Sequence, residues 1–228
     1  MLLGGLIYSL LVKPTPKLIV NDTTYHSAAD YQSVVDDQLK SLKDRNKITF
    51  NEQEIVNSLQ KKFPEIANVS IELPLLSETP VVTLDVAAPS FFLRSNGQDY
   101  IIDDQGVATG VTEQQPKIKG LTTLSDQSGF KTFLGERVLS AQSVNFINSV
   151  LAQAAHANIP VKSLILPTQY QELDLQTADR AYFVKFYLGG DALLQTGQFL
   201  AARHNFDANG NQPSQYLDVR VPGKIFYK

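Results

Sequence analysis

Apolar and polar residues alternate or recur at helical spacing through the first part of the chain. Leu18 to Val20 is a short apolar run typical of a strand, and Ser27 with Asp30 is the pattern of a capping box at a helix start. The buried stripe of that helix is expected at Tyr31, Val34, Val35, Leu39 and Leu42. A helix after the first strand is therefore predicted.

A second helix is expected after Asn51, which is a suitable N-cap residue followed by Glu54 at the third position. Its apolar face contains Ile55, Leu59 and Phe63, and Pro64 ends it. Residues 68–73 and 80–86 then alternate as strands, and Val82, Leu84 and Val86 share one face. The predicted order is strand, helix, helix, strand, strand.

The rest of the chain reads as a longer sheet with two helices. Tyr100–Ile102 and Val107–Thr109 flank Asp103–Gly106, a predicted hairpin turn. A helix is expected after Leu139 or Ser140, with an apolar side at Val144, Ile147, Leu151 and Ala154. Strands are expected at 161–166, 171–175 and 181–188. A helix capped by Asp191 is expected to run to about His204, with Arg203 and His204 in its last turn and a turn at Asn209–Gly210.

The last thirteen residues predict two short strands joined by Pro222–Gly223. Alternation places Leu217, Val219 and Val221 inward, and Tyr216, Asp218 and Arg220 outward. A strand at the end of a chain often lies at a sheet edge, where another polypeptide can add a strand. This segment therefore suggests a binding function.

The first twelve residues are uncharged and mostly apolar. They are too few to cross a bilayer, since a helix needs about 20 apolar residues. We interpret residues 1–12 as the outer end of a truncated transmembrane helix and residues 13–17 as its linker. An ordinary buried segment and a signal remnant are the alternatives.

Composition narrows the class of protein. With 228 residues, 43% of them hydrophobic and 19% charged, the chain can form one large or two small cores. A net charge of -3 gives no electrostatic footprint for nucleic acid. The absence of cysteine excludes disulfides and thiolate metal sites.

No enzymatic pattern stands out. His26, His156 and His204 lie in separate segments without a metal-binding or nucleophile motif, and each is expected to be a surface or helix-end residue. Asp103 and Asp104 are expected to satisfy their own turn. We predict no catalytic residue, cofactor, metal or small-molecule substrate.

Four motifs in order give the chain a family resemblance. They are Lys62–Ile66 before a strand, Pro89 followed by Tyr100–Gly106, Leu188–Gly189 before a helix, and Tyr216–Arg220 near the end. Together with the apolar amino terminus, they resemble the bacterial cell-division family FtsQ/DivIB.

The resemblance implies an α+β fold. Residues 18–87 would form a POTRA-like β-α-α-β-β domain, and residues 88–228 a β domain with a mixed or antiparallel sheet and two packed helices. It also implies a non-catalytic, single-pass membrane protein at the division septum, with most of the chain extracytoplasmic. The implied partners are FtsB-like and FtsL-like division proteins and, indirectly, septal peptidoglycan synthases.

By the same resemblance, the carboxy-terminal strands would dock an FtsB-like partner by strand addition. Tyr216 and Arg220 would be recognition residues, and Asp218 would orient Arg220. In the family an aromatic residue commonly follows the arginine. This chain has Val221 at that position, and Phe226 and Tyr227 would supply the aromatic anchor instead. The whole expected contact set is Tyr216, Asp218, Arg220, Val221, Lys224, Ile225, Phe226 and Tyr227.

Two alternatives remain open on the sequence. Asp218 and Arg220 are two residues apart on one strand, so they can simply pair with each other or with a neighbouring strand, for about 0.2–1 kcal/mol. A POTRA-type chaperone or secretion module that receives client polypeptides for export is the other functional reading.

Overall fold

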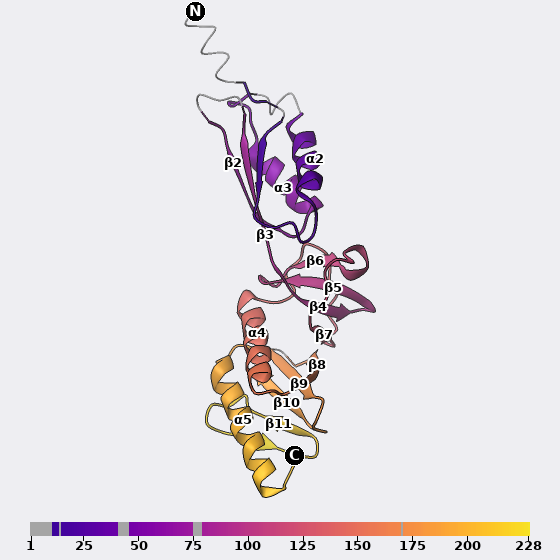
Figure 1. Ribbon diagram of the computed structural model, residues 1–228, viewed down its shortest axis with the longest axis vertical. Helices are drawn as coiled ribbons and strands as arrows, with labels where there is room; N and C mark the ends of the chain where they lie inside the picture. The colour runs from indigo at the N-terminus through magenta and orange to yellow at the C-terminus, as the bar shows by residue number, and fades with distance from the viewer. Residues whose placement is uncertain (1–10, 14, 41–45, 75–78, 170) are drawn as a thin grey trace, which may run out of the picture. The chain divides into compact units, whose positions relative to one another are not determined.

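The computed structural model describes residues 11–13, 15–40, 46–74, 79–169 and 171–228. They form two compact units, the first from Met1–Ala88 with Gln115–Ile118 and the second from Pro89–Gln114 with Lys119–Lys228. Each unit combines a mixed sheet with two helices, so the chain is of the α+β class, as predicted (Figure 1).

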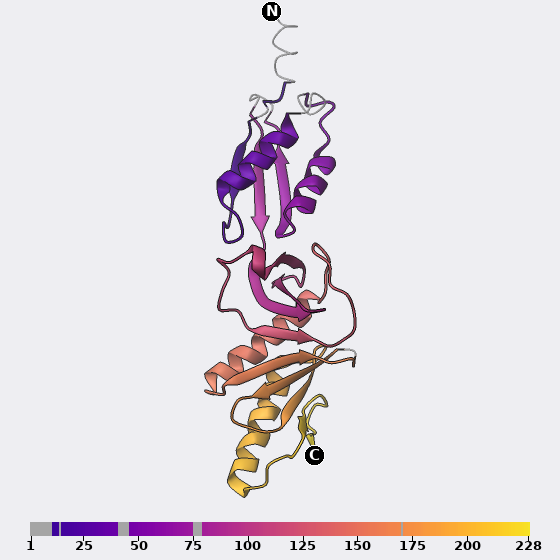
Figure 2. The ribbon, with the colours of Figure 1, turned by 90° about the vertical axis from the view of Figure 1, so that its right-hand side faces the viewer.

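The first unit contains the predicted order of elements. These are β1 (Lys17–Val20), α2 (Ala28–Leu39), α3 (Glu52–Lys62), β2 (Ile66–Glu72) and β3 (Val81–Val86). β3 lies in the middle of the sheet, parallel to β1 and antiparallel to β2. Figures 1 and 2 show both helices on one face of this sheet.

Local signals in the sequence explain these two helices. The Ser27 side chain accepts from the backbone N–H of Asp30, whose carboxylate accepts from the N–H of Ser27, so the capping box is confirmed. Asn51 caps α3 through the N–H of Glu54. The expected apolar stripes are buried, except that Leu42 lies outside the described residues: Tyr31, Val34, Val35, Leu39, Ile55, Leu59 and Phe63.

The amino terminus is described only from Leu11 onward, so the expectation for residues 1–10 lies outside the described residues. Leu11 forms an isolated antiparallel bridge with Asn46, and Val12 is buried. Among the helices that the structure describes, none has both the length and the apolar character needed to span a bilayer.

The second unit is built on a nine-stranded sheet. Its strands in chain order are β4 (Pro89–Ser95), β5 (Gln98–Asp103), β6 (Ala108–Val111), β7 (Thr123–Asp126), β8 (Val161–Leu166), β9 (Glu172–Thr177), β10 (Phe183–Tyr187), β11 (Tyr216–Asp218) and β12 (Phe226–Tyr227). The spatial order is β12-β11-β10-β9-β8-β7-β4-β5-β6. A 3-10 turn at Thr112–Gln114 follows β6.

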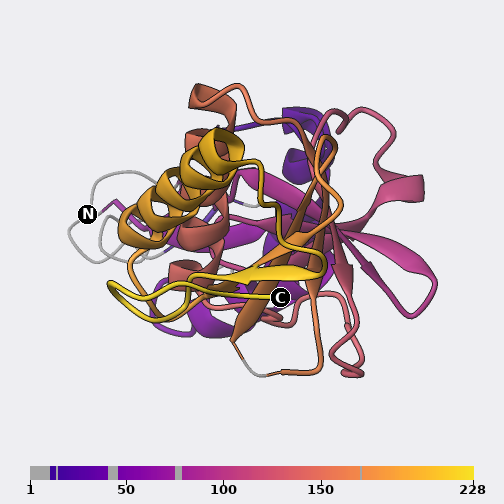
Figure 3. The ribbon, with the colours of Figure 1, turned by 90° about the horizontal axis from the view of Figure 1, so that it is seen from below.

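Helices α4 (Ala141–His156) and α5 (Ala192–Asn209) pack side by side over β8 to β11 (Figure 3). Alternate side chains of these strands, such as Leu164, Leu175, Val184 and Leu217, form the core beneath the helices. We call the opposite side of these strands the open face. Its side chains are Ser163, Ile165, Glu172, Asp174, Gln176, Phe183, Lys185, Tyr187, Tyr216, Asp218, Arg220 and Phe226.

Three features differ from the sequence-based expectation. Strands β4 and β7 were not expected, since neither shows a long alternating pattern. Helix α5 continues five residues past His204 to Asn209, so Arg203 and His204 are not in its last turn. Asn209–Gly210 is the end of this helix, because Gly210 adopts the left-handed conformation (φ 71°) that caps it.

The Asp103–Gly106 turn is confirmed. Asp103 Oδ1 accepts hydrogen bonds from the backbone N–H groups of Gln105 (2.9 Å) and Val107 (2.8 Å). Asp103 is therefore occupied in shaping the hairpin between β5 and β6.

Candidate partner-binding edge

Strand β12 is one edge of the nine-stranded sheet. Tyr216 and Lys228 exchange two backbone hydrogen bonds (3.3 and 3.1 Å), so they form a hydrogen-bonded antiparallel pair. In such a ladder the backbone groups of successive residues point to opposite sides. The N–H and C=O groups of Tyr227 therefore point away from β11, along the outer edge, and continuing the alternation by one step gives the same direction for Ile225, which directly precedes β12.

Helix α5 holds this edge through one glutamine. Gln198 Nε2 donates to the carbonyl oxygens of Val221 and Lys224 (both 3.1 Å), and its Oε1 accepts from the N–H of Gly223 (3.0 Å). The Tyr227 ring packs edge-on against Phe206 at 5.0 Å between centroids. Gly223 allows the turn because its φ is 71°.

Apolar side chains are exposed beside these backbone groups. Val221 is 42% exposed, Ile225 36%, Phe226 51% and Tyr227 62%. Phe226 lies on the open face and Tyr227 lies on the opposite side against Phe206, so the edge offers a polypeptide partner apolar contacts on both sides of the sheet.

A network of charges lies next to this edge on the open face. Glu172 is buried and accepts from Lys185 Nζ (2.6 Å) and from Arg220. Arg220 also donates to Asp218 from Nε to Oδ1 (2.9 Å) and from Nη2 to Oδ2 (2.6 Å). The network therefore ties β9, β10 and β11 together across the open face.

Arg220 is largely engaged within the chain. Its side chain uses three donor atoms on Asp218 and Glu172, while an arginine has five N–H donors. The hydrogen bonds that Arg220 donates to the Asp218 carboxylate keep the pKa of Arg220 above its usual value. Burial alone would raise the pKa of Asp218, but hydrogen bonds from the Arg220 side chain and backbone hold it below its usual range. Two N–H donors of Arg220 meet no acceptor among the described residues and can serve an outside one.

Asp174 differs from the other carboxylates of the open face. Burial, with the nearby charge of Glu172, raises its pKa to about 6, although Lys185 and Arg220 oppose that shift. Its Oδ1 is buried and accepts no hydrogen bond from the described residues. Ionisation of Asp174 at neutral pH therefore lowers the free energy of unfolding.

Asp174→Asn is expected to raise the free energy of unfolding at about pH 7.5 by roughly 1–2 kcal/mol, after allowance for partial exposure. The folded pKa of about 6 lies above the unfolded value, so the carboxyl stabilises the fold when protonated and this contribution is lost as the pH rises through 6. The gain should vanish near pH 4. Urea unfolding at both pH values measures it, with the exposed turn residue Asp104→Asn as control. An equal gain at both values would contradict this account.

The structure places the eight expected contact residues within one end of the sheet, and Asp218 lies on the open face with Tyr216 as alternation predicts, but Val221 does not point inward. Asp218 is buried (9% exposed), because Arg220 and the neighbouring strands cover it. Val221 is exposed, because β11 ends at Asp218 and the chain turns at Pro222. The pairing left open by the sequence is present, because Arg220 donates both to Asp218 and to Glu172 of β9.

Four residues of this region were missed: Glu172, Asp174, Lys185 and Gln198. The polar alternation of Glu172, Asp174 and Gln176 along one strand was the available signal. Only the strand register shows that these side chains meet Lys185 and Arg220.

A separate polar cluster lies in the first unit. Glu65 is buried and accepts from Tyr31 Oη (3.0 Å), and it lies 2.7 Å from His26 Nδ1. The His26 ring packs against Tyr31 and Phe63. His26 directly precedes the N-cap of α2 and is partly covered by this packing, and His156 ends α4 in an exposed position, so both lie at helix ends as expected.

The described residues contain no group of three histidine, cysteine or acidic side chains able to hold a metal ion. No protein-family model and no curated protein matches the chain. The function is therefore argued from the edge and the open face.

Proposed function

We propose that the chain is a non-catalytic, membrane-anchored scaffold of the bacterial division machinery, of the FtsQ/DivIB type. In this proposal the first unit is a POTRA domain, the second is the β domain, and both are extracytoplasmic at the septum. The β12 edge docks an FtsB-like partner by strand addition. FtsL-like proteins and septal peptidoglycan synthases would belong to the same assembly.

One observation carries the binding part of this proposal. The outer edge of β12 presents the backbone groups of Ile225 and Tyr227 beside exposed Phe226, on a hairpin held by Gln198. A preformed edge lowers the entropy cost of binding a strand. The order of the four sequence motifs supports the choice of family, and the strand-helix-helix-strand-strand order of the first unit is compatible with it.

Both the backbone and the side chains of this edge would contribute to binding of the partner. The partner strand would exchange hydrogen bonds with Ile225 and Tyr227, while Phe226 would fill an apolar pocket of the partner. The free donors of Arg220 would favour an acidic partner residue. Affinity would then depend more on the backbone N–H of residue 225 than on its side chain.

Ile225→Pro is expected to lower affinity for the soluble segment of the same organism's FtsB-like protein by at least tenfold. Proline removes an N–H that points outward, so pairing of β12 with β11 should survive. Ile225→Ala is the matched control, since it keeps the N–H and shortens the side chain. Isothermal titration gives the affinities, and circular dichroism checks the fold.

Equal affinities of the proline and alanine variants would contradict strand addition. No binding by the folded parent chain would remove the division partner from the proposal. It would favour the secretion-module alternative, for which the two edges of the first sheet, β1 and β2, would be the docking strands. Binding of unfolded client peptides would then be the decisive assay.

A further inference from the structure

The open face contains a hollow of about 350 Å³ over β8, β9 and β10. Ile165, Ala181 and Phe183 supply apolar walls, and Asp174 and Gln176 supply polar groups. In the sheet register Ile165, Asp174 and Lys185 stand in one row, and Ser163, Gln176 and Phe183 in the next. The hollow thus places one carboxylate between apolar walls and a polar rim that includes Lys162 and Arg180.

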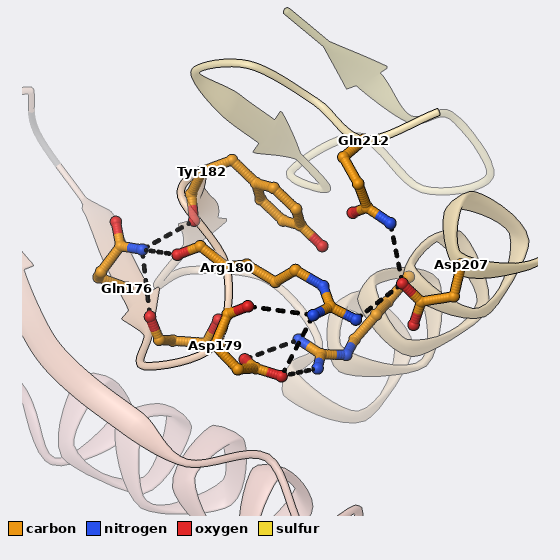
Figure 4. A network of polar contacts seen from close by, with 8 residues as sticks. Gln176, Asp179, Arg180, Tyr182, Asp207 and Gln212 are labelled. Atoms are coloured by element: carbon orange, nitrogen blue, oxygen red, sulfur yellow. Dashed lines mark hydrogen bonds and ion pairs between the residues drawn. The ribbon is translucent and has the colours of Figure 1, made fainter. Parts of the chain in front are cut away.

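The rim of the hollow is fixed by hydrogen bonds (Figure 4). Gln176 Nε2 donates to three carbonyl oxygens of the β9–β10 turn, those of Thr177 (3.2 Å), Arg180 (2.6 Å) and Tyr182 (3.1 Å). The turn is also tied to α5, because Arg180 donates to Asp207 at 2.8 Å, and Asp207 accepts from Gln212. The hollow is therefore preformed by the fold.

The cations nearest to Asp174 bind other carboxylates. Lys185 stands opposite Asp174 in the register but donates to Glu172. Arg220 is divided between Asp218 and Glu172, and Arg180 is paired with Asp207. Lys162 lines the hollow with an exposed side chain. The Asp174 carboxylate lines the hollow, and its buried Oδ1 accepts no hydrogen bond from the described residues, so none of these cations satisfies that atom.

We propose that this hollow binds a lysine or arginine side chain of a partner polypeptide. The aliphatic stem would lie against Ile165, Ala181 and Phe183, and the cationic head would meet the Asp174 carboxylate. That the occupant belongs to a polypeptide follows from the proposed function, on which this inference rests. The hollow lies three strand spacings from β12, about 14 Å, so one partner segment can reach both.

A proton would compete with the bound cation. Burial raises the pKa of Asp174 to about 6, and the charges that face it are Glu172, Lys185, Asp218 and Arg220, with Lys162 and Arg180 at the rim. Only the ionised carboxylate attracts the cation. Affinity should therefore fall about tenfold from about pH 7.5 to pH 5.

The test titrates the chain with Nα-acetyl-arginine methylamide and, as the neutral probe, Nα-acetyl-citrulline methylamide, followed by nuclear magnetic resonance. We expect the arginine probe to shift resonances of Ile165, Ala181 and Phe183 with a Kd on the order of 1–10 mM at low salt. The citrulline probe should bind at least fivefold more weakly. Equal binding of the two probes, or no saturable shift at these residues, would overturn the proposal.

Two pairs of variants distinguish the contribution of the Asp174 carboxylate to binding from that of the shape of the hollow. Asp174→Asn should weaken the arginine probe at least fivefold and remove the pH dependence, whereas Asp104→Asn should change neither. Ile165→Lys places a tethered amine beside Asp174 and should block the probe, while Ile165→Gln should retain it. Unchanged affinity in Asp174→Asn would refute the assignment. Ile225→Pro should still bind the probe, so failure of strand docking and failure of the hollow are distinguishable.

Discussion

Gly106→Ala is expected to lower the free energy of unfolding of the second unit by about 4 kcal/mol or more. A Cβ at this position would lie 2.1 Å from the carbonyl oxygen of Leu139 and 2.7 Å from its carbon. Both are backbone atoms that cannot rotate away. The Gly106 carbonyl also accepts from the N–H groups of Val138 and Leu139, so the hairpin is fixed against the segment that leads into α4. Urea unfolding measures the loss.

Gly97→Ala is the matched control for this prediction. Gly97 has a similar positive φ (78° against 82°), but a Cβ there meets nothing within 4 Å. Gly97→Ala should lower the free energy of unfolding by about 1–2 kcal/mol, because only the left-handed backbone conformation is unfavourable for alanine there. Equal losses in the two variants would show that the close approach of Leu139 has no energetic effect.

Glu65→Ala should cost the first unit about 3 kcal/mol, the second largest effect expected. The change leaves the Tyr31 hydroxyl buried without its acceptor and removes the partner of His26. Tyr31→Phe should cost less, about 1–2 kcal/mol, because it removes a single donor and leaves the His26 contact. Denaturant unfolding compares the two variants. A larger loss in Tyr31→Phe than in Glu65→Ala would contradict this order.

The same cluster predicts an alkaline transition. Burial first, and then the charge and hydrogen bond of Glu65, raise the pKa of Tyr31 strongly. Because the folded pKa lies above the unfolded one, this contribution is present in full below about pH 10 and is lost at higher pH. Above that pH, the free energy of unfolding of Tyr31→Phe should depend less on pH than that of the parent chain.

Helix starts were predictable because their signals are local. Ser27, Asn51, Ser140 and Asp191 each accept from an N–H three residues later, as their residue types suggest. The end of α5 was misplaced because a glycine that follows asparagine serves a turn and a helix C-cap equally well. Strand β7 was missed because four residues paired with two distant parallel strands carry no local signal.

The binding edge was easier to predict than the charges behind it. Tyr216 to Tyr227 lie next to each other in the chain, so their common location follows from the sequence. Glu172 and Arg220 are 48 residues apart and meet only because β10 separates β9 from β11 in the register. Alternation placed Asp218 on the correct face without indicating its burial, and it placed Val221 inward although β11 ends at Asp218.

The parallel pairing of β11 with β10 has a consequence for biosynthesis. All eighteen residues of α5 separate the two strands, so β11 can pair only after that helix has been translated and has packed. Until then β10 is itself an uncovered edge, where a nascent chain is vulnerable to mispairing. The strand that would receive the partner is thus among the last parts to form, and docking would select chains that have completed their folding.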